Sequence, residues 1–182
     1  MRLKHVTLFI GIILLAGCST ISNLLTTSPD VTIKTGFDGN GIAVLNFSRI
    51  GPIPNDSGKL TADKLADVFF ARSKYNVIDR SRVNEAQTSL ELFSTESLSA
   101  EQIQKIGQKL KANYLVLGRI HCIADGEFFK LNEDKQLNIS FRIISVSNQE
   151  LIGLANYTCK YDDELVEQIE EMITKIVVKA TE

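Results

Sequence analysis

Ile42-Ala43-Val44-Leu45-Asn46-Phe47 is the apolar run that decides the fold of this chain. A short, almost wholly apolar run of this kind is typical of a strand buried on both faces of a sheet. A segment rich in Gly and Pro follows at 51–58, and apolar residues at helical spacing then predict a helix over about 59–72. The run therefore indicates a strand that begins an α/β arrangement.

Further elements follow in order along the chain. A short strand is predicted at 75–79, and a helix capped by Ser81 extends to about Leu92. Ser99 and Gln102 form a capping-box pattern that opens the next helix, and Asn113 is predicted as its left-handed stop. Strands are predicted at 114–122, 136–146 and 151–160, with a hairpin turn at 147–150, and an amphipathic helix at about 163–179.

The order of the strands follows from the handedness of their connections. Right-handed crossovers place the strands at 75–79 and 114–122 on either side of the strand at 42–47. The last three strands form an antiparallel meander. With the strands numbered along the chain from the one at 42–47, the predicted order across the sheet is 2-1-3-4-5. The predicted fold is α/β (α+β), a mixed sheet with helices on its faces. Residues 31–34 can add a short edge strand, and the alternation along 136–146 predicts that one face of the sheet is wet.

The N-terminal residues read as a targeting segment. Arg2 and Lys4 precede an apolar run that is shorter than the about 20 residues that span a bilayer. Leu15-Ala16-Gly17-Cys18 resembles a bacterial lipobox. Residues 1–17 are therefore predicted to be a signal peptide cut between Gly17 and Cys18, with S-diacylglycerol and N-palmitoyl groups on Cys18. The alternative is an ordinary signal peptide followed by an incidental cysteine.

The predicted lipid sets the location of the domain. Ser19 after the lipidated cysteine favours the outer membrane over the inner one, and the periplasmic face is preferred over the cell surface. Polar residues through 18–40 predict a flexible tether, and 41–182 form the domain. The formal net charge is −2 and no basic tract is present, so nucleic acid is not an expected partner. The membrane, contacted through the lipid, is the expected partner.

No set of residues predicts catalysis, a cofactor or a metal. His121 is the one histidine after the leader, and it adjoins Cys122. Neighbouring strand residues point to opposite faces, so the two cannot form a nucleophile pair. Asp162-Asp163-Glu164 could hold a cation, but acidic residues at a helix start favour an interaction with the helix dipole instead. We therefore expect no enzymatic activity.

Cys122 and Cys159 are predicted to be free thiols. The hairpin register places both opposite about Asn138, on either side of the middle strand. Two residues separated by a strand lie about 9–10 Å apart, whereas a disulfide needs Cα atoms within about 7 Å.

Three segments resemble the CsgG family of curli secretion lipoproteins. Residues 42–47 are similar to its "VAVLPF" opening strand, 77–82 to its "VIDR-S" junction, and 112–118 to its "GADYLVLG" strand. The likeness spans about 40–160. The hairpin near Arg142 to Gln149 lacks the Asp and Gly of the family pattern. TolB amino-terminal and LpoB-type domains share these motifs.

The resemblance implies an envelope role rather than a channel. The pore-forming hairpins of a CsgG channel need on the order of 40 more residues, and the segments 93–99 and 123–135 are too short for them. The sequence therefore predicts an accessory or assembly factor for envelope export or for surface structures. The alternative is an LpoB-like regulator of a periplasmic enzyme that acts on peptidoglycan. Self-association, which the family's rings suggest, is left open.

Overall fold

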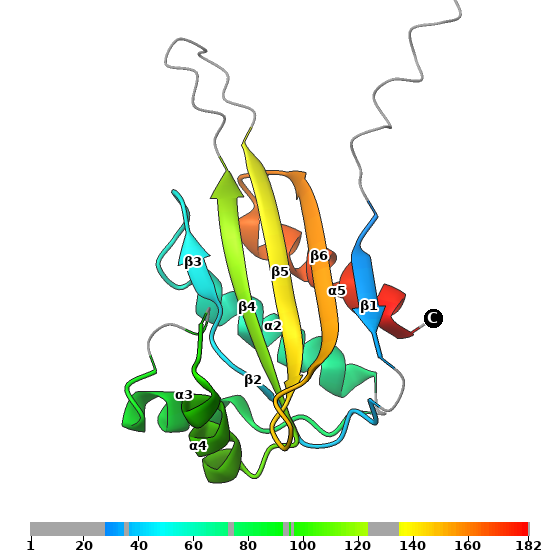
Figure 1. Ribbon diagram of the computed structural model, residues 1–182. Helices are drawn as coiled ribbons and strands as arrows, with labels where there is room; N and C mark the ends of the chain where they lie inside the picture. The colour runs from blue at the N-terminus through cyan, green and yellow to red at the C-terminus, as the bar shows by residue number, and fades with distance from the viewer. Residues whose placement is uncertain are drawn as a thin grey trace, which may run out of the picture.

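In the computed structural model, a mixed sheet lies between helices that contact both of its faces (Figure 1). The structure describes residues 28–34, 37–72, 75–92, 95, 97–123 and 135–181. Its elements are, in chain order, β1 (Asp30–Ile33), β2 (Ile42–Val44), β3 (Ser48–Ile50), α2 (Ser57–Ala71), α3 (Arg80–Ser89), α4 (Ala100–Leu110), β4 (Tyr114–Ile123), β5 (Gln136–Ser145), β6 (Leu151–Lys160) and α5 (Leu165–Thr181).

The strand order confirms the predicted topology. The sheet runs β1-β6-β5-β4-β2, and β4 is antiparallel to β5 and parallel to β2. The predicted strand at 75–79 is reduced to one parallel bridge between Val77 and Ile42. Backbone hydrogen bonds of 2.9 and 2.8 Å join Ile42 to Asn76 and Ile78, which places this segment beside β2 as expected. The predicted edge strand is β1, which pairs with β6.

The run at 42–47 is shorter as a strand than the sequence predicts. β2 ends at Val44. The Leu45 N–H still donates to the Val116 carbonyl of β4 at 3.0 Å, but the N–H groups that follow find acceptors outside the sheet. Asn46 N–H donates to the Gln87 side chain of α3 at 2.9 Å, and Phe47 N–H donates to the Gly58 carbonyl at the start of α2 at 3.2 Å. The chain then returns to the sheet as β3, which the sequence reading missed and which pairs in parallel with β4.

Two hydrophobic cores lie on the two faces of the sheet. Side chains such as Val116 and Ile120 pack on one face against α2 and α5. Their neighbours on β4, Leu115 and Leu117, point to the other face and pack against α3 and α4. The alternation along β4 therefore divides the core into two layers.

Helix boundaries show which caps the sequence identifies correctly. The capping box of Ser99 and Gln102 is confirmed, with both reciprocal hydrogen bonds present. Asp79, not Ser81, caps α3: its side chain accepts from the Ser81 N–H at 2.9 Å. The left-handed residue that ends α4 is Lys111, with φ of 54°, rather than Asn113. Asn113 instead donates its N–H to Gly41, where β4 begins to pair with the β2 region.

Candidate functional site

One face of the sheet is covered only at one end. In Figure 1, α2 and α5 lie behind the sheet, and α3 and α4 lie beside its lower end, so most of β4, β5 and β6 is left open towards the viewer. On this side the alternation of β5 presents Ser140 and Arg142, both partly exposed, which confirms the predicted wet face. The side chains of this surface, called the polar face below, are Asp30, Thr32, Arg119, His121, Asn138, Ser140, Arg142, Leu154, Asn156, Thr158 and Lys160.

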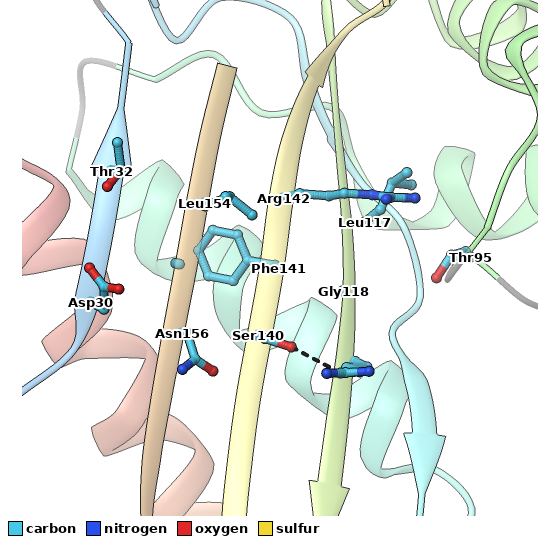
Figure 2. Close-up of a pocket in the computed structure, with 12 residues that line it drawn as sticks. Asp30, Thr32, Thr95, Leu117, Gly118, Ser140, Phe141, Arg142, Leu154 and Asn156 are labelled. Atoms are coloured by element: carbon cyan, nitrogen blue, oxygen red, sulfur yellow. Dashed lines mark hydrogen bonds between the residues drawn. The ribbon is translucent and has the colours of Figure 1, made fainter. Parts of the chain in front are cut away.

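The strand register brings these side chains into rows across the sheet. One row runs from Thr32 through Leu154 to Arg142, and the next runs from Asp30 through Asn156 and Ser140 to Arg119. Residues of both rows line an open hollow of about 620 Å³, and Thr95 lies at its margin (Figure 2). The hollow is therefore built on rigid strands rather than on loops.

Hydrogen bonds fix part of the polar face. Arg119 Nε donates to Ser140 Oγ at 3.3 Å (Figure 2). Asn138 Nδ2 donates to Asn156 Oδ1 at 2.7 Å and to Thr158 Oγ1 at 2.8 Å. These contacts cross from one strand to the next, so they hold the side chains against the sheet and explain why Asn138 is buried.

The polar face combines cations with an exposed apolar side chain. Arg119, Arg142 and Lys160 supply three positive charges, and Asp30 supplies one negative charge at the β1 edge. A guanidinium group can bind a carboxylate in a bidentate manner, through two parallel N–H···O hydrogen bonds. Leu154 stands among them with 50% of its surface exposed. This arrangement suits a partner surface that offers carboxylates around an apolar contact.

The structure separates His121 from Cys122 as the sequence predicts. His121 lies on the polar face, whereas Cys122 points to the opposite face and is 2% exposed. Since the backbone of β4 lies between the two side chains, they do not form a reacting pair.

Cys122 and Cys159 are free thiols on either side of β5. Both pair with Leu137, one residue from the predicted position, so the strand that separates them is confirmed. Burial raises the pKa of both thiols. Cys159 Sγ also accepts a hydrogen bond from Gln168 Nε2 at 3.2 Å. Both groups are therefore protonated at neutral pH.

The acidic run at 162–164 lies at the start of α5. Asp162 Oδ1 accepts from the Glu164 N–H at 3.2 Å, and the Asp162 N–H donates to Gln168 Oε1 at 3.0 Å. These contacts shape the entry into the helix. Among the residues that the structure describes, no three His, Cys, Asp or Glu side chains come together in a way that could hold a metal ion.

The predicted lipid site lies outside the described residues. Gly17 and Cys18, residues 93, 94 and 96 of the segment at 93–99, and residues 124–134 of the segment at 123–135 belong to the parts of the chain that the structure does not describe. Within the described ranges, no helix has both the length and the apolar character that a bilayer crossing requires.

The sequence predicts that one face of the sheet is wet, but it does not predict which side chains come together on that face. The alternation along β5 was enough to predict exposed polar side chains. The rows that cross the strands depend on the registers of four separate strands, and Leu154 and Asp30 join the surface only through β6 and β1. The β4–β5 register places Arg119 opposite Ser140 and Arg142 opposite Leu117, so the two cations lie in neighbouring rows.

No family model matches the sequence, and no curated protein matches it. Solved structures do match. A dodecamer of a single-residue variant of PelC from Paraburkholderia phytofirmans aligns with a TM-score of 0.53 at 15% identity, covering 83% of this chain and 96% of that chain. The fold is similar to that of PelC.

Two further structures align with lower scores. The LpoB C-terminal domain from Escherichia coli aligns at a TM-score of 0.48 and 14% identity, over 70% of this chain and 88% of that chain. Lipoprotein GNA1162 from Neisseria meningitidis aligns at 0.48 and 11%, over 78% and 99%. At such identities the likeness to PelC concerns the fold alone, and the relation to the CsgG family stays a prediction.

Proposed function

We propose that this chain is a non-enzymatic lipoprotein of the outer membrane that self-associates. It serves as an accessory or assembly factor for envelope export or for building surface structures. The observation that carries the proposal is the likeness to PelC, which spans 96% of the PelC chain and whose structure is a dodecamer. The open polar face supports it, because that surface offers charged and apolar contacts to a partner.

The anchor in this proposal is the lipid on Cys18. Residues 1–17 are the signal peptide, and the polar residues 18–40 form the lipid-bearing segment and tether that lead into the domain at 41–182. A tether of about 20 residues has an average span of roughly 25 Å, which keeps the domain near its membrane. The sheet reaches into this segment through β1, which pairs with β6 from Asp30 onward.

Fractionation of cells tests the anchor. Cys18→Ala should move the protein out of the membrane fraction or leave an uncleaved precursor, because the thiol carries the lipid. Cys159→Ser is the matched control, since it removes a partly buried thiol of the domain and should leave the protein in the membrane. Cleaved Cys18→Ala protein that stayed in membranes through salt and carbonate washing would contradict a lipid-only anchor.

Crosslinking in cells followed by purification tests the role. Enrichment of export or surface-assembly components, together with copies of this chain, supports the proposal. Enrichment of a peptidoglycan synthase would instead support the alternative, a regulator of that periplasmic enzyme. Light scattering on the purified protein reports self-association directly: a single-chain mass at all concentrations would contradict it.

A further inference from the structure

The outer side of α5 complements the polar face in charge. Acidic side chains begin just before the helix and continue through its first half, while its lysines, Lys175 and Lys179, come later. We call the exposed part of this segment the acidic surface; its residues are Glu164, Val166, Glu167, Glu170 and Glu171. It carries four carboxylates, of which Glu170 pairs with Lys64 of α2 and Glu171 pairs with Lys175, each at 2.6 Å. The polar face carries three cations and one carboxylate.

The two surfaces also match in their apolar residues. Few large hydrophobic side chains are exposed in the described part of the chain, and one stands in each surface: Leu154 is 50% exposed and Val166 is 46% exposed. Leu154 has Arg142 beside it in the strand register, and Val166 is next to Glu167 in sequence. An apolar contact ringed by opposite charges is a common design of protein interfaces.

The two surfaces cannot meet within one chain. α5 packs against the face of the sheet that faces away from the polar face, so the sheet lies between them (Figure 1). A contact between them must therefore join two copies. Because it uses different patches on the two copies, it is heterologous, and its repetition gives a closed ring or an open filament.

We propose that the polar face binds the acidic surface of α5 from a second copy of this chain, so that copies assemble head to tail. This inference rests on the self-association proposed above and names the surfaces that make it. The sheet face that α3 and α4 leave open is then covered by a helix of the neighbouring copy. Arg119 and Arg142 face the carboxylates of Glu164 and Glu167, and Leu154 packs against Val166.

Two single substitutions test this arrangement on the full lipidated chain, purified in detergent. Leu154→Glu puts a carboxylate among the partner's acids, and Val166→Arg puts a cation against Arg142, which lies beside Leu154 on the partner's polar face. Each position is exposed, so the fold should be kept, which far-UV circular dichroism checks. We expect oligomers of more than two copies for the unchanged protein and a single-chain mass for each variant.

Mixing the two variants distinguishes head-to-tail assembly from every symmetric contact. The Leu154→Glu chain retains its acidic surface, and the Val166→Arg chain retains its polar face, so one good contact remains between them. The mixture should therefore stop at heterodimers. Phe70→Glu is the matched control: Phe70 is 71% exposed on α2, which contributes to neither surface, and this variant should assemble like the unchanged chain.

The outcomes separate this inference from the proposal beneath it. Variants that keep the full oligomer mass, or a mixture that stays monomeric, overturn the head-to-tail contact while self-association stands. An unchanged protein that is monomeric overturns both. A photoreactive phenylalanine analogue at position 154 gives a direct test: the expected crosslink falls within residues 162–171 of another copy, and a crosslink to a different protein would overturn the inference.

Discussion

Arg80 Nε lies 2.8 Å from Asp63 Oδ1, and this ion pair joins the first residue of α3 to the middle of α2. The same guanidinium donates to the Val44 carbonyl at the end of β2 and to the Asn46 side chain just after it. One side chain thus satisfies acceptors on both sides of the point where the chain leaves the sheet. Its side chain is only 14% exposed.

Arg80→Met should destabilise the protein. The substitution keeps an apolar side chain of similar length but leaves the Val44 carbonyl and the Asn46 amide without their donor, which costs about 2–3 kcal/mol. Lys59→Met is the matched control, because Lys59 pairs with the same carboxylate at 2.6 Å but is 57% exposed. The control should change the free energy of unfolding by about 0.5 kcal/mol or less. Urea unfolding measures both, and equal losses would contradict the structural role of Arg80.

Asp63 should make stability depend on pH in the acid range. Burial raises the pKa of this carboxyl, but hydrogen bonds from Lys59 and Arg80 outweigh that effect, and the pKa lies below its usual value. The unfolded chain therefore binds the proton first. The stabilisation is complete above the unfolded value of about 3.9 and is lost as the pH falls through the lower, folded value. Asp63→Asn should flatten the unfolding free energy between about pH 5 and pH 3; parallel curves for the two proteins would contradict this.

Predictions from the sequence worked where one local pattern decides the outcome. The capping box at Ser99 and the hairpin after β5 depend on neighbouring residues, and both are confirmed. Strand order followed from connection handedness, which holds for nearly all parallel crossovers. The exit of the chain from the sheet after Val44 was not predictable in this way, because Gln87 and Gly58, which take up its N–H groups, are brought there by tertiary structure.

The residues of the polar face could not be predicted from the sequence for the same reason. Arg119 and Arg142 come from strands that are far apart in sequence, and only the β4–β5 register places Leu117 opposite Arg142 and Ser140 opposite Arg119. The charge pattern of α5, by contrast, is visible in the sequence. The docking role proposed for it depends on the structure, which places α5 on the side of the sheet opposite the polar face.

Lys111→Gly should stabilise the protein. Lys111 ends α4 with φ of 54°, a left-handed conformation that costs a residue with a Cβ more than it costs glycine. The side chain is exposed, so the substitution removes little packing, and a gain of about 0.5–1 kcal/mol is expected. Asn113→Gly is the contrasting variant, because Asn113 is not in this conformation and should give no gain. A thermal melt of both variants decides between the two positions.

Cys122 and Cys159 should react slowly with iodoacetamide in the folded protein. Burial raises the pKa of each thiol, so little of the reactive thiolate is present near neutral pH. After unfolding without a reductant, both should be alkylated fully, because neither is in a disulfide. A peptide map under non-reducing conditions gives the measurement, and a linked Cys122–Cys159 peptide would contradict the separation of these residues by β5.

Gly118→Ala should destabilise the protein through the ring of Phe47. A Cβ on Gly118 would lie 2.4 Å from both Cε2 and Cζ of that ring, far inside van der Waals contact. Phe47 is 5% exposed in the core, with its ring centroid 6.2 Å from that of Phe141, so it has little room to move. Overpacking of this kind costs about 1–3 kcal/mol.

A double-mutant cycle tests whether Phe47 is the cause of that loss. Phe47→Leu shortens the side chain and alone should cost stability, since it removes buried apolar surface. In the Gly118→Ala background the same change relieves the clash, so its cost should be smaller by about 1 kcal/mol or more. Additive losses would place the strain elsewhere. Phe47 and Gly118 lie in two of the three segments that resemble the CsgG family. Their contact explains why these two segments have these residues: a small residue on β4 makes room for the aromatic ring that follows β2.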